Sequence, residues 1–319
     1  MREALAVAAT ARQRTSPNPW VGAVVVPDGD GPVALGATEP PGGPHAEVVA
    51  LELAGDDARG ATVYVTLEPC DHHGRTPPCT DALIAAGVRR VVVGILDPDP
   101  KVAGRGVEKL RSAGIEVELG VLADEVEACL KPYLVHRRTG RPYVVLKLAA
   151  TLDGRIAAPD GTSRWITSAP ARLDVHRLRA DSDAIVVGAG TVRADDPALT
   201  VREVEGESPR RVVLGSAPAG AAVHPALEHT GDLCPLLDRL GEDGVLQVLV
   251  EGGAHVAHRF HTEGLVDRYV LYLAPALLGG DDGVPLFAGP GAATMADVWR
   301  GRIVEVARLG PDVRIDMVP

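Results

Sequence analysis

Short Val-rich segments alternate with segments of helical periodicity along this chain, and no other feature constrains its fold as strongly. The segments Val91 to Ile95 and Ala184 to Val187 have the composition of buried strands, whereas Ala46 to Leu53 has helical spacing. Aromatic residues make up only 3% of the chain, so Ala, Val and Leu must form the cores, which is typical of buried parallel sheets. The pattern predicts α/β architecture with helices on both faces of a sheet.

The alternation is interrupted once, and this interruption divides the chain. The stretch from Tyr133 to Pro142 is basic, carries Gly140 and Pro142, and is the best candidate for a linker. A new strand pattern begins at Tyr143. Because 319 residues exceed the ~100–200 of a typical single domain, we predict two α/β domains, 1–142 and 143–319.

Charge and hydropathy argue against several classes of protein. The net charge is −11 and no Lys/Arg run is longer than a pair, which disfavours a nucleic-acid partner. No apolar run approaches the ~18 residues of a membrane span, and Arg12 and Arg14 interrupt the Ala-rich N-terminal segment, so no signal-peptide pattern is present. We therefore expect a cytoplasmic protein, without disulfides, that acts on a small molecule.

The strongest chemical signal is His45-Ala46-Glu47 followed by Pro69-Cys70 and by Cys79. One imidazole and two thiolates bind zinc and leave a fourth position open for water, as in catalytic sites. Glu47, two residues after His45, can lie beside that water without binding the metal. This combination is the signature of zinc deaminases, in which the metal lowers the pKa of water toward ~7. We predict His45, Cys70 and Cys79 as ligands and Glu47 as the catalytic acid and base that carries the proton to the ring nitrogen and then to the leaving ammonia.

The spacing of the cysteines departs from the general signature. Eight residues separate Cys70 from Cys79, where zinc deaminases usually have two. A closed structural zinc site is one alternative, with His72 or His73 as fourth ligand, although it leaves Glu47 without a role. Two buried cysteines without metal are another. We interpret both histidines as loop residues near the substrate.

Three segments of the first half together resemble a known family. They are Pro17 to Gly22, Pro44 to Glu47 and Thr66 to Cys79, and they are similar to the deaminase domain of the bifunctional riboflavin-biosynthesis family, diaminohydroxyphosphoribosylaminopyrimidine deaminase / 5-amino-6-(5-phosphoribosylamino)uracil reductase. The long insert between the cysteines distinguishes that family from cytidine and tRNA deaminases. The resemblance implies a cytidine-deaminase-like three-layer sandwich and a contact of Asn18 with the pyrimidine. Taken alone, an Asn before Pro19 is equally typical of a turn.

The second half carries weaker signals of its own. Glu251-Gly252-Gly253 follows the strand pattern Leu246 to Val250, and glycines there let a phosphate approach the amides at a helix N-terminus. A tight turn without a ligand is the alternative. Gly188-Ala189-Gly190 is a poor dinucleotide signal by itself. Lys147 lies within the Val-rich segment Val144 to Ala150, where it requires either an edge strand with a solvated ammonium group or a special role.

Here too the segments resemble the same family, in the same order along the chain. Lys147 to Arg155, Ser163 to Ser168, Thr191 to Arg202 and Val250 to Gly253 are similar to its reductase domain. The resemblance implies a dihydrofolate-reductase-like α/β fold and NADPH as cofactor, and the choice over NADH rests on it alone. The residues implied at the cofactor are Ala150, Trp165, Thr191, Asp195, Ser216 and Gly253 to Arg259, including Ala254 and His255. Those implied at the substrate are Ser163, Arg179, Leu199, Arg202 and Glu251, of which the two arginines match phosphate geometry.

These observations predict a bifunctional enzyme of riboflavin biosynthesis. Its zinc site would deaminate 2,5-diamino-6-(5-phosphoribosylamino)pyrimidin-4-one, and NADPH would then reduce the ribosyl to a ribityl side chain. A homo-oligomer, either dimer or tetramer, is expected. The segment between Ser216 and Gly241 is short for the family and shows no strand before Asp232, so a deaminase with a non-catalytic reductase half is the main alternative. A nucleic-acid base deaminase and a zinc-stabilised binding module are weaker ones.

Overall fold

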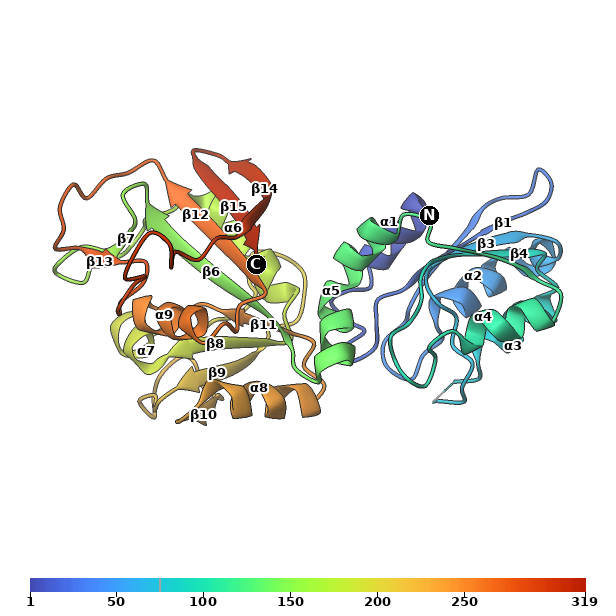
Figure 1. Ribbon diagram of the computed structural model, residues 1–319, viewed down its shortest axis with the longest axis horizontal. Coiled ribbons are helices and arrows are strands. Elements are labelled where there is room, and N and C mark those ends of the chain that lie inside the picture. The colour runs from blue at the N-terminus through green and yellow to red at the C-terminus, as the bar shows by residue number, and fades with distance from the viewer. Residues whose placement is uncertain (75) are drawn as a thin grey trace. The chain divides into compact units, whose positions relative to one another are not determined.

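The computed structural model describes residues 1–74 and 76–319, and Arg75, within the insert between the two cysteines, lies outside the described residues. The chain forms two compact units, Met1–Arg141 and Pro142–Pro319 (Figure 1). Each unit is built on a sheet of its own. None of the helices in the described part of the chain has the length and apolar composition that crossing a membrane requires.

The first unit contains a five-stranded mixed sheet in the order β2-β1-β3-β4-β5. Strand β1 pairs antiparallel with β2 and β3, whereas β3, β4 and β5 are parallel. In chain order the elements are α1 (Arg2–Ala9), β1 (Gly22–Val26), β2 (Ala34–Ala37), α2 (Ala46–Ala54), β3 (Thr62–Leu67), α3 (Cys79–Ala86), β4 (Arg90–Ile95), α4 (Arg105–Ser112), β5 (Glu116–Leu119) and α5 (Ala123–Thr139), with a short 3-10 turn at Gly55–Ala58.

Two glycines show that helices cover both faces of this sheet. Neighbouring residues of a strand point to opposite faces, so Gly22 and Ala23 of β1 face opposite ways, and Gly36 of β2, paired with Ala23, shares the face of Ala23. A Cβ atom on Gly22 would lie 1.9 Å from the carbonyl oxygen of Ala4 in α1, and one on Gly36 would lie 2.2 Å from that of Ala46 in α2. Helices α1 and α2 therefore cover opposite faces, which gives the three-layer sandwich that the sequence predicts.

The predicted linker is wrong over most of its length. Tyr133 to Thr139 belongs to α5, a 17-residue helix that continues through Pro132, and only Gly140 to Pro142 connect the last helix of the first unit to the first strand of the second. The physical reason is burial: Leu130, Tyr133 and Leu134 have helical spacing and face the core, while the basic residues that suggested a loop lie at the end of the helix.

The second unit contains an eight-stranded sheet in the order β10-β9-β8-β11-β6-β12-β15-β14. The first six strands in that order are parallel, and β15 and β14 run antiparallel at one edge. The elements are β6 (Tyr143–Thr151), β7 (Arg155–Ala157), α6 (Ala169–Ala180), β8 (Ala184–Gly188), α7 (Ala189–Asp195), β9 (Arg210–Leu214), β10 (Leu227–His229), α8 (Leu233–Glu242), β11 (Gln247–Val250), α9 (Ala254–Thr262), β12 (Arg268–Ala274), β13 (Val284–Pro285), β14 (Arg302–Leu309) and β15 (Asp312–Val318).

Helices lie on both faces of this sheet as well. Alternate residues of β6, β8 and β11 point into one apolar cluster, which α8 and α9 close with Leu236, Leu240 and Phe260. Tyr269 of β12 belongs to that cluster, so Tyr272, three residues later, points to the opposite face. There its hydroxyl donates a 2.7 Å hydrogen bond to Asp174 of α6. The unit is thus an α/β sandwich, as expected.

One local prediction for this unit needs correction. A strand does precede Asp232, because β10 pairs in parallel with β9 through Leu227, Glu228 and His229. Ser168 occupies the N-cap position of α6 but does not cap the helix with its side chain. Its hydroxyl and its main-chain N–H both donate to Asp312 of β15 at 2.7 Å, which turns the side chain toward that strand.

Candidate functional site

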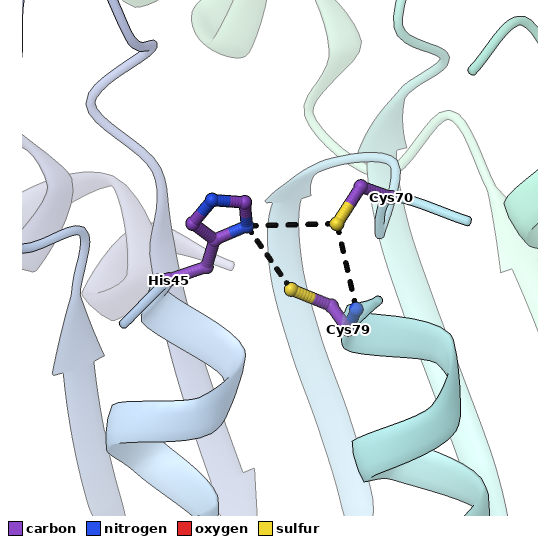
Figure 2. Close-up of side chains that lie close together, drawn as sticks. All are labelled: His45, Cys70 and Cys79. Atoms are coloured by element: carbon purple, nitrogen blue, oxygen red, sulfur yellow. Dashed lines mark hydrogen bonds between the residues drawn. The ribbon is translucent and has the colours of Figure 1, made fainter. Parts of the chain in front are cut away.

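Three segments of the first unit bring the predicted zinc ligands together. His45 is the N-cap residue of α2, Cys79 is the first residue of α3, and Cys70 lies in the loop that follows β3. Figure 2 shows the three side chains converging from these separate elements. The His45 Nδ1 atom lies 3.2 Å from the Cys79 sulfur and 3.6 Å from the Cys70 sulfur, and the Cys79 N–H donates to the Cys70 sulfur at 3.4 Å.

The donor set of this cluster fits zinc. One ring nitrogen and two sulfurs lie within 4.8 Å of one another, and imidazole and thiolate are the ligands zinc prefers. Hydrogen bonds to the Cys70 sulfur, from Cys79 first and then from His45, lower the pKa of Cys70 to about 4. A thiolate is the form that binds metal, so this sulfur is prepared for an ion.

The structure does not support the closed zinc site. Among the described residues, the only group of metal-binding side chains consists of His45, Cys70 and Cys79, so neither His72 nor His73 joins it as a fourth ligand. The His73 side chain is exposed, and the Nδ1 atom of His72 is buried without a hydrogen-bond partner. A three-ligand set keeps a position open for water, as a catalytic site requires.

Glu47 is buried in the first turn of α2, with only 3% of its surface exposed. Burial raises its pKa to about 7, against the opposing effect of His45. A carboxyl group whose pKa lies near neutrality can both accept and donate a proton under physiological conditions. Its place beside His45 and Cys79, without membership of the ligand group, matches the predicted catalytic role.

Asn18 lies in a turn, as its neighbour Pro19 suggests. Its main-chain N–H donates to the carbonyl oxygen of Thr15 at 2.7 Å, and its side chain is half-buried. The turn explains its backbone, and the contact with the pyrimidine stays a prediction.

Most residues predicted at the cofactor lie beyond the carboxyl ends of parallel strands. Ala150 is near the end of β6, Thr191 follows β8, Ser216 follows β9 and Gly253 follows β11. These strands are neighbours or near neighbours in the parallel part of the sheet, so their carboxyl ends share one edge, where open α/β sheets bind ligands. Sequence positions more than a hundred residues apart are therefore brought to the same edge.

The start of α9 supplies a surface for an anionic cofactor. Gly253 is its N-cap residue and has no side chain that could accept a capping hydrogen bond. The main-chain N–H groups of Ala254 and His255 therefore have no partner within the helix. A Cβ atom on Gly253 would lie 3.1 Å from the Thr191 hydroxyl oxygen, which shows how closely two of the predicted residues approach. Unpaired amides and the helix dipole together favour a phosphate, so the residues present fit NADPH.

Trp165 and Asp195 lie in a neighbouring pair of segments. The Trp165 ring is 71% exposed and stacks against the Arg172 guanidinium, 4.5 Å from the ring centroid. Asp195 is the last residue of α7, and its carbonyl oxygen accepts a 2.5 Å hydrogen bond from Arg164. An exposed aromatic surface flanked by guanidinium groups suits a planar, negatively charged ligand.

Three charged side chains meet in the interior of the second unit. Arg179 pairs with Glu251 through two hydrogen bonds, Nε to Oε1 at 2.6 Å and Nη2 to Oε2 at 2.9 Å, and Lys147 Nζ lies 3.9 Å from Oε2. The remaining Arg179 nitrogen donates to the carbonyl of Thr200 at 3.2 Å. Each nitrogen of the guanidinium that the sequence suggested as a phosphate clamp thus has a partner within the protein.

Lys147 is the residue that sequence reasoning noticed and did not assign. The edge-strand interpretation is wrong, since β6 lies inside the sheet between β11 and β12 and the lysine is largely buried. Burial lowers the pKa of Lys147, and the charge of Glu251 offsets this only in part. Burial also opposes ionisation of Glu251, but Arg179 and Lys147 outweigh it and lower the pKa of that carboxyl group.

The other predicted substrate residues are less closely gathered. Leu199 is buried with a positive φ of 54°, and the Arg202 side chain is exposed and donates to the Thr200 hydroxyl at 2.9 Å. The Arg202 main-chain N–H donates to His176 Nδ1 at 3.3 Å, which attaches this segment to α6. Ser163 is half-buried in the loop between β7 and α6.

Comparison with protein families matches each part of the chain. Residues 1–95 match the cytidine and deoxycytidylate deaminase zinc-binding region, and residues 142–315 match the RibD C-terminal domain. The chain is 44% identical to riboflavin biosynthesis protein RibD of Escherichia coli, over all of this chain and 98% of that protein. It is 45% identical to RibD of Mycobacterium tuberculosis, over 95% of this chain and 92% of that one.

Solved structures agree over the whole length. Acinetobacter baumannii RibD is 39% identical to this chain and has a TM-score of 0.92. The superposition covers 100% of this chain and 97% of that one. The Thermotoga maritima diaminohydroxyphosphoribosylaminopyrimidine deaminase/5-amino-6-(5-phosphoribosylamino)uracil reductase is 38% identical with a TM-score of 0.90, again over 100% and 97% of the chains. Both the sequence order and the three-dimensional fold are therefore shared.

Proposed function

The chain belongs to the RibD family of riboflavin-biosynthesis enzymes, and on that premise we propose how its residues divide the two reactions. The enzyme is bifunctional, and its deaminase and reductase domains are both present. We assign deamination to residues 1–142 and reduction to residues 143–319. The substrate of the first is 2,5-diamino-6-(5-phosphoribosylamino)pyrimidin-4-one, and the second reduces the ribosyl of the deaminated product to a ribityl group.

The zinc cluster is the observation that carries the deaminase assignment. His45, Cys70 and Cys79 would hold the ion, which when bound supplies a water activated for attack at neutral pH. Glu47 accepts a proton from the attacking water and returns it to the ring nitrogen and then to the leaving ammonia. Its pKa of about 7 suits both directions of transfer. Asn18, in the turn before Pro19, orients the pyrimidine.

In the reductase unit, the residues beyond the strand ends hold the nucleotide. NADPH is the family's cofactor and supplies the hydride. The amides at the start of α9 would hold a phosphate of the cofactor, and the exposed Trp165 ring would contact one of its planar groups. The full cofactor set is Ala150, Trp165, Thr191, Asp195, Ser216, Gly253, Ala254 and His255. The substrate set is Ser163, Arg179, Leu199, Arg202 and Glu251, in which the exposed Arg202 binds the ribose phosphate and Arg179 holds Glu251.

Lys147 supplies the proton that the reduction needs. Opening the ribose breaks the bond between C1′ and the ring oxygen, the hydride adds to C1′, and the ring oxygen takes up a proton. A buried lysine with a lowered pKa, held beside the Glu251 carboxylate, is suited to that donation. The lysine is the middle residue of β6, three residues before Ala150.

One experiment tests the assignment of both halves. The purified zinc-loaded chain receives the pyrimidine substrate, while ammonia release and NADPH absorbance are followed together. We expect ammonia release with a matching loss of NADPH. Glu47→Gln should abolish ammonia release with zinc still bound, and should still oxidise NADPH when given 5-amino-6-(5-phosphoribosylamino)uracil. Deamination by Glu47→Gln at the wild-type rate contradicts the role of Glu47, and ammonia without NADPH loss supports the non-catalytic reductase half.

Assembly and location are parts of the same proposal. We propose a homo-oligomer, because the edge strand β14 exposes Ile303 and Val306 by more than half of their surface. Light scattering after size exclusion tests this, and a monomeric mass at micromolar concentration contradicts it. We also propose a cytoplasmic location, which is supported by the fact that Cys70, Cys79, Cys129 and Cys234 form no disulfide.

A further inference from the structure

The two ends of the insert between the cysteines are joined immediately beside the zinc ligands. The main-chain N–H of Thr80 donates to the carbonyl oxygen of Cys70 at 3.2 Å. The Thr80 hydroxyl donates to Asp71 at 2.9 Å. Asp71 directly follows Cys70 and Thr80 directly follows Cys79, so these bonds close the loop at its base.

A lysine from outside the insert contacts both ends. Lys109 of α4 has its ammonium nitrogen 2.5 Å from an oxygen of Asp71 and 2.6 Å from an oxygen of Asp81. Asp71 belongs to the Cys70 end and Asp81 to the Cys79 end. One cation therefore bridges two carboxylates that each lie within two residues of a sulfur ligand. We call Asp71, Thr80, Asp81 and Lys109 the insert clamp.

The charges explain why the bridge matters locally. Without Lys109, Asp71 and Asp81 are like charges held close together, and their repulsion separates the two ends of the insert. The side chains of Lys109, Asp71 and Asp81 are 35%, 21% and 50% exposed, and pairs this exposed contribute little to global stability. The clamp is therefore expected to act on the base of the insert rather than on unfolding of the unit.

We propose that Lys109 and Asp71 are positioning residues that hold Cys70 and Cys79 at the separation a metal ion requires. The insert is long, and each freely moving end lowers the fraction of chains in which both sulfurs face His45. Joining the ends before the ion arrives removes that cost. The inference rests on the proposed ligand set of His45, Cys70 and Cys79, and none of the clamp residues is itself a ligand.

The test measures metal affinity on the full chain. Zinc is titrated against a competing chelator in wild type, Lys109→Met, Lys109→Arg and Arg111→Met. Arg111 is the matched control, because it is an exposed cation on the same helix α4 and bonds only the carbonyl of Val117 in the described contacts. We expect about tenfold weaker zinc binding for Lys109→Met, in the range seen when groups that orient metal ligands are removed. Lys109→Arg should restore most of the affinity and Arg111→Met should leave it unchanged.

A spectroscopic readout separates positioning from general damage. In the cobalt-loaded chain, the thiolate-to-metal absorption reports how the sulfurs are held. Lys109→Met should change that absorption while the thermal midpoint of the metal-free chain stays within a few degrees of wild type. Equal zinc affinity and equal cobalt spectra in Lys109→Met overturn the proposal. So does an affinity loss that Lys109→Arg does not rescue.

Two further variants keep the outcomes distinct. Asp71→Asn retains an acceptor for Thr80 and loses the charge, so it should weaken zinc binding less than Lys109→Met and provides the test if the lysine variant fails to fold. His45→Ala reports on the ligand set itself. Unchanged zinc binding in His45→Ala refutes the proposed ligands and the insert clamp with them. If His45→Ala loses zinc binding while Lys109→Met and Asp71→Asn bind zinc as wild type does, only the insert clamp is refuted.

Discussion

Arg179 holds Glu251 in a two-pronged ion pair inside the second unit, with nitrogen–oxygen distances of 2.6 and 2.9 Å. The two side chains are 12% and 10% exposed, and Lys147 approaches the same carboxylate at 3.9 Å. Two basic side chains thus share one carboxylate. The protein's own contacts thus fix the arrangement of these charged groups before any ligand binds.

Replacing Arg179 with methionine should destabilise the second unit by about 3 kcal/mol, because the change leaves a buried carboxylate with only its longer contact to Lys147. Urea unfolding followed by tryptophan fluorescence measures this. Arg177→Met is the matched control, since Arg177 is an exposed cation on the same helix. If Arg179→Met loses less than about 1 kcal/mol of unfolding free energy, no more than Arg177→Met, the ion pair of Arg179 with Glu251 does not stabilise the unit as we expect.

Lys147→Met should lower the rate of NADPH oxidation by about a hundredfold or more, since it removes the proposed proton donor. Ammonia release should be unchanged, because the lysine belongs to the other unit. NADPH binding, followed by fluorescence, should remain within a few fold of wild type. If NADPH turnover by the variant is normal, another group provides the proton.

Metal removal should expose a pH dependence that depends on Glu47. Its pKa is about 7 in the folded chain and near 4.5 when unfolded, so the folded state binds the extra proton between these values. The metal-free protein should therefore lose stability as pH rises from about 4.5 to about 7, by about 3 kcal/mol in total. In Glu47→Gln this loss of stability between about pH 4.5 and 7 should be absent. If the unfolding free energies of metal-free wild type and Glu47→Gln change with pH in the same way, Glu47 is not the group responsible.

Glu68→Ala should destabilise the first unit by about 3 kcal/mol. The buried Glu68 carboxylate accepts main-chain hydrogen bonds from Asp97 at 3.2 Å, Gly104 at 3.0 Å and Val107 at 3.3 Å. The substitution leaves these donors without a partner in a largely buried place, which costs about 1–3 kcal/mol each before relaxation. Glu52→Ala, at an exposed position of α2, should change the unfolding free energy by less than about 0.5 kcal/mol. Similar unfolding free energies for both variants would show that the segment from Asp97 to Val107 does not depend on Glu68.

The parts of the fold that local patterns determine could be predicted from the sequence. The predicted strands Val91 to Ile95 and Ala184 to Val187 lie within β4 and β8, and the predicted helical segment Ala46 to Leu53 lies within α2. The C-terminal hairpin β14–β15 was missed, although Val313, Ile315 and Met317 alternate with polar residues. In β14 no such alternation is visible, because the neighbouring residues Ile303 and Val304 are both apolar and exposed at the edge of the sheet.

The candidate site divides in the same way. His45, Glu47, Cys70 and Cys79 were found because the chemistry of zinc restricts residue types and spacing. The burial of Lys147 depends on strand order, which places β6 between β11 and β12, and no local pattern contains that order. Contacts such as Lys109 with Asp71, 38 positions apart, likewise exist only after folding.

Gly36 of β2 is in close contact with α2, the helix that positions His45 and Glu47. A methyl group at this position would lie 2.2 Å from the carbonyl oxygen of Ala46 and 2.5 Å from the amide nitrogen of Ala50, so helix α2 rests on bare backbone. His45 is the N-cap residue of α2 and Glu47 lies in its first turn, so the position of the helix on the sheet also places these two residues. A methyl group at position 36 would therefore have to displace the start of α2 from the sheet, and His45 and Glu47 with it.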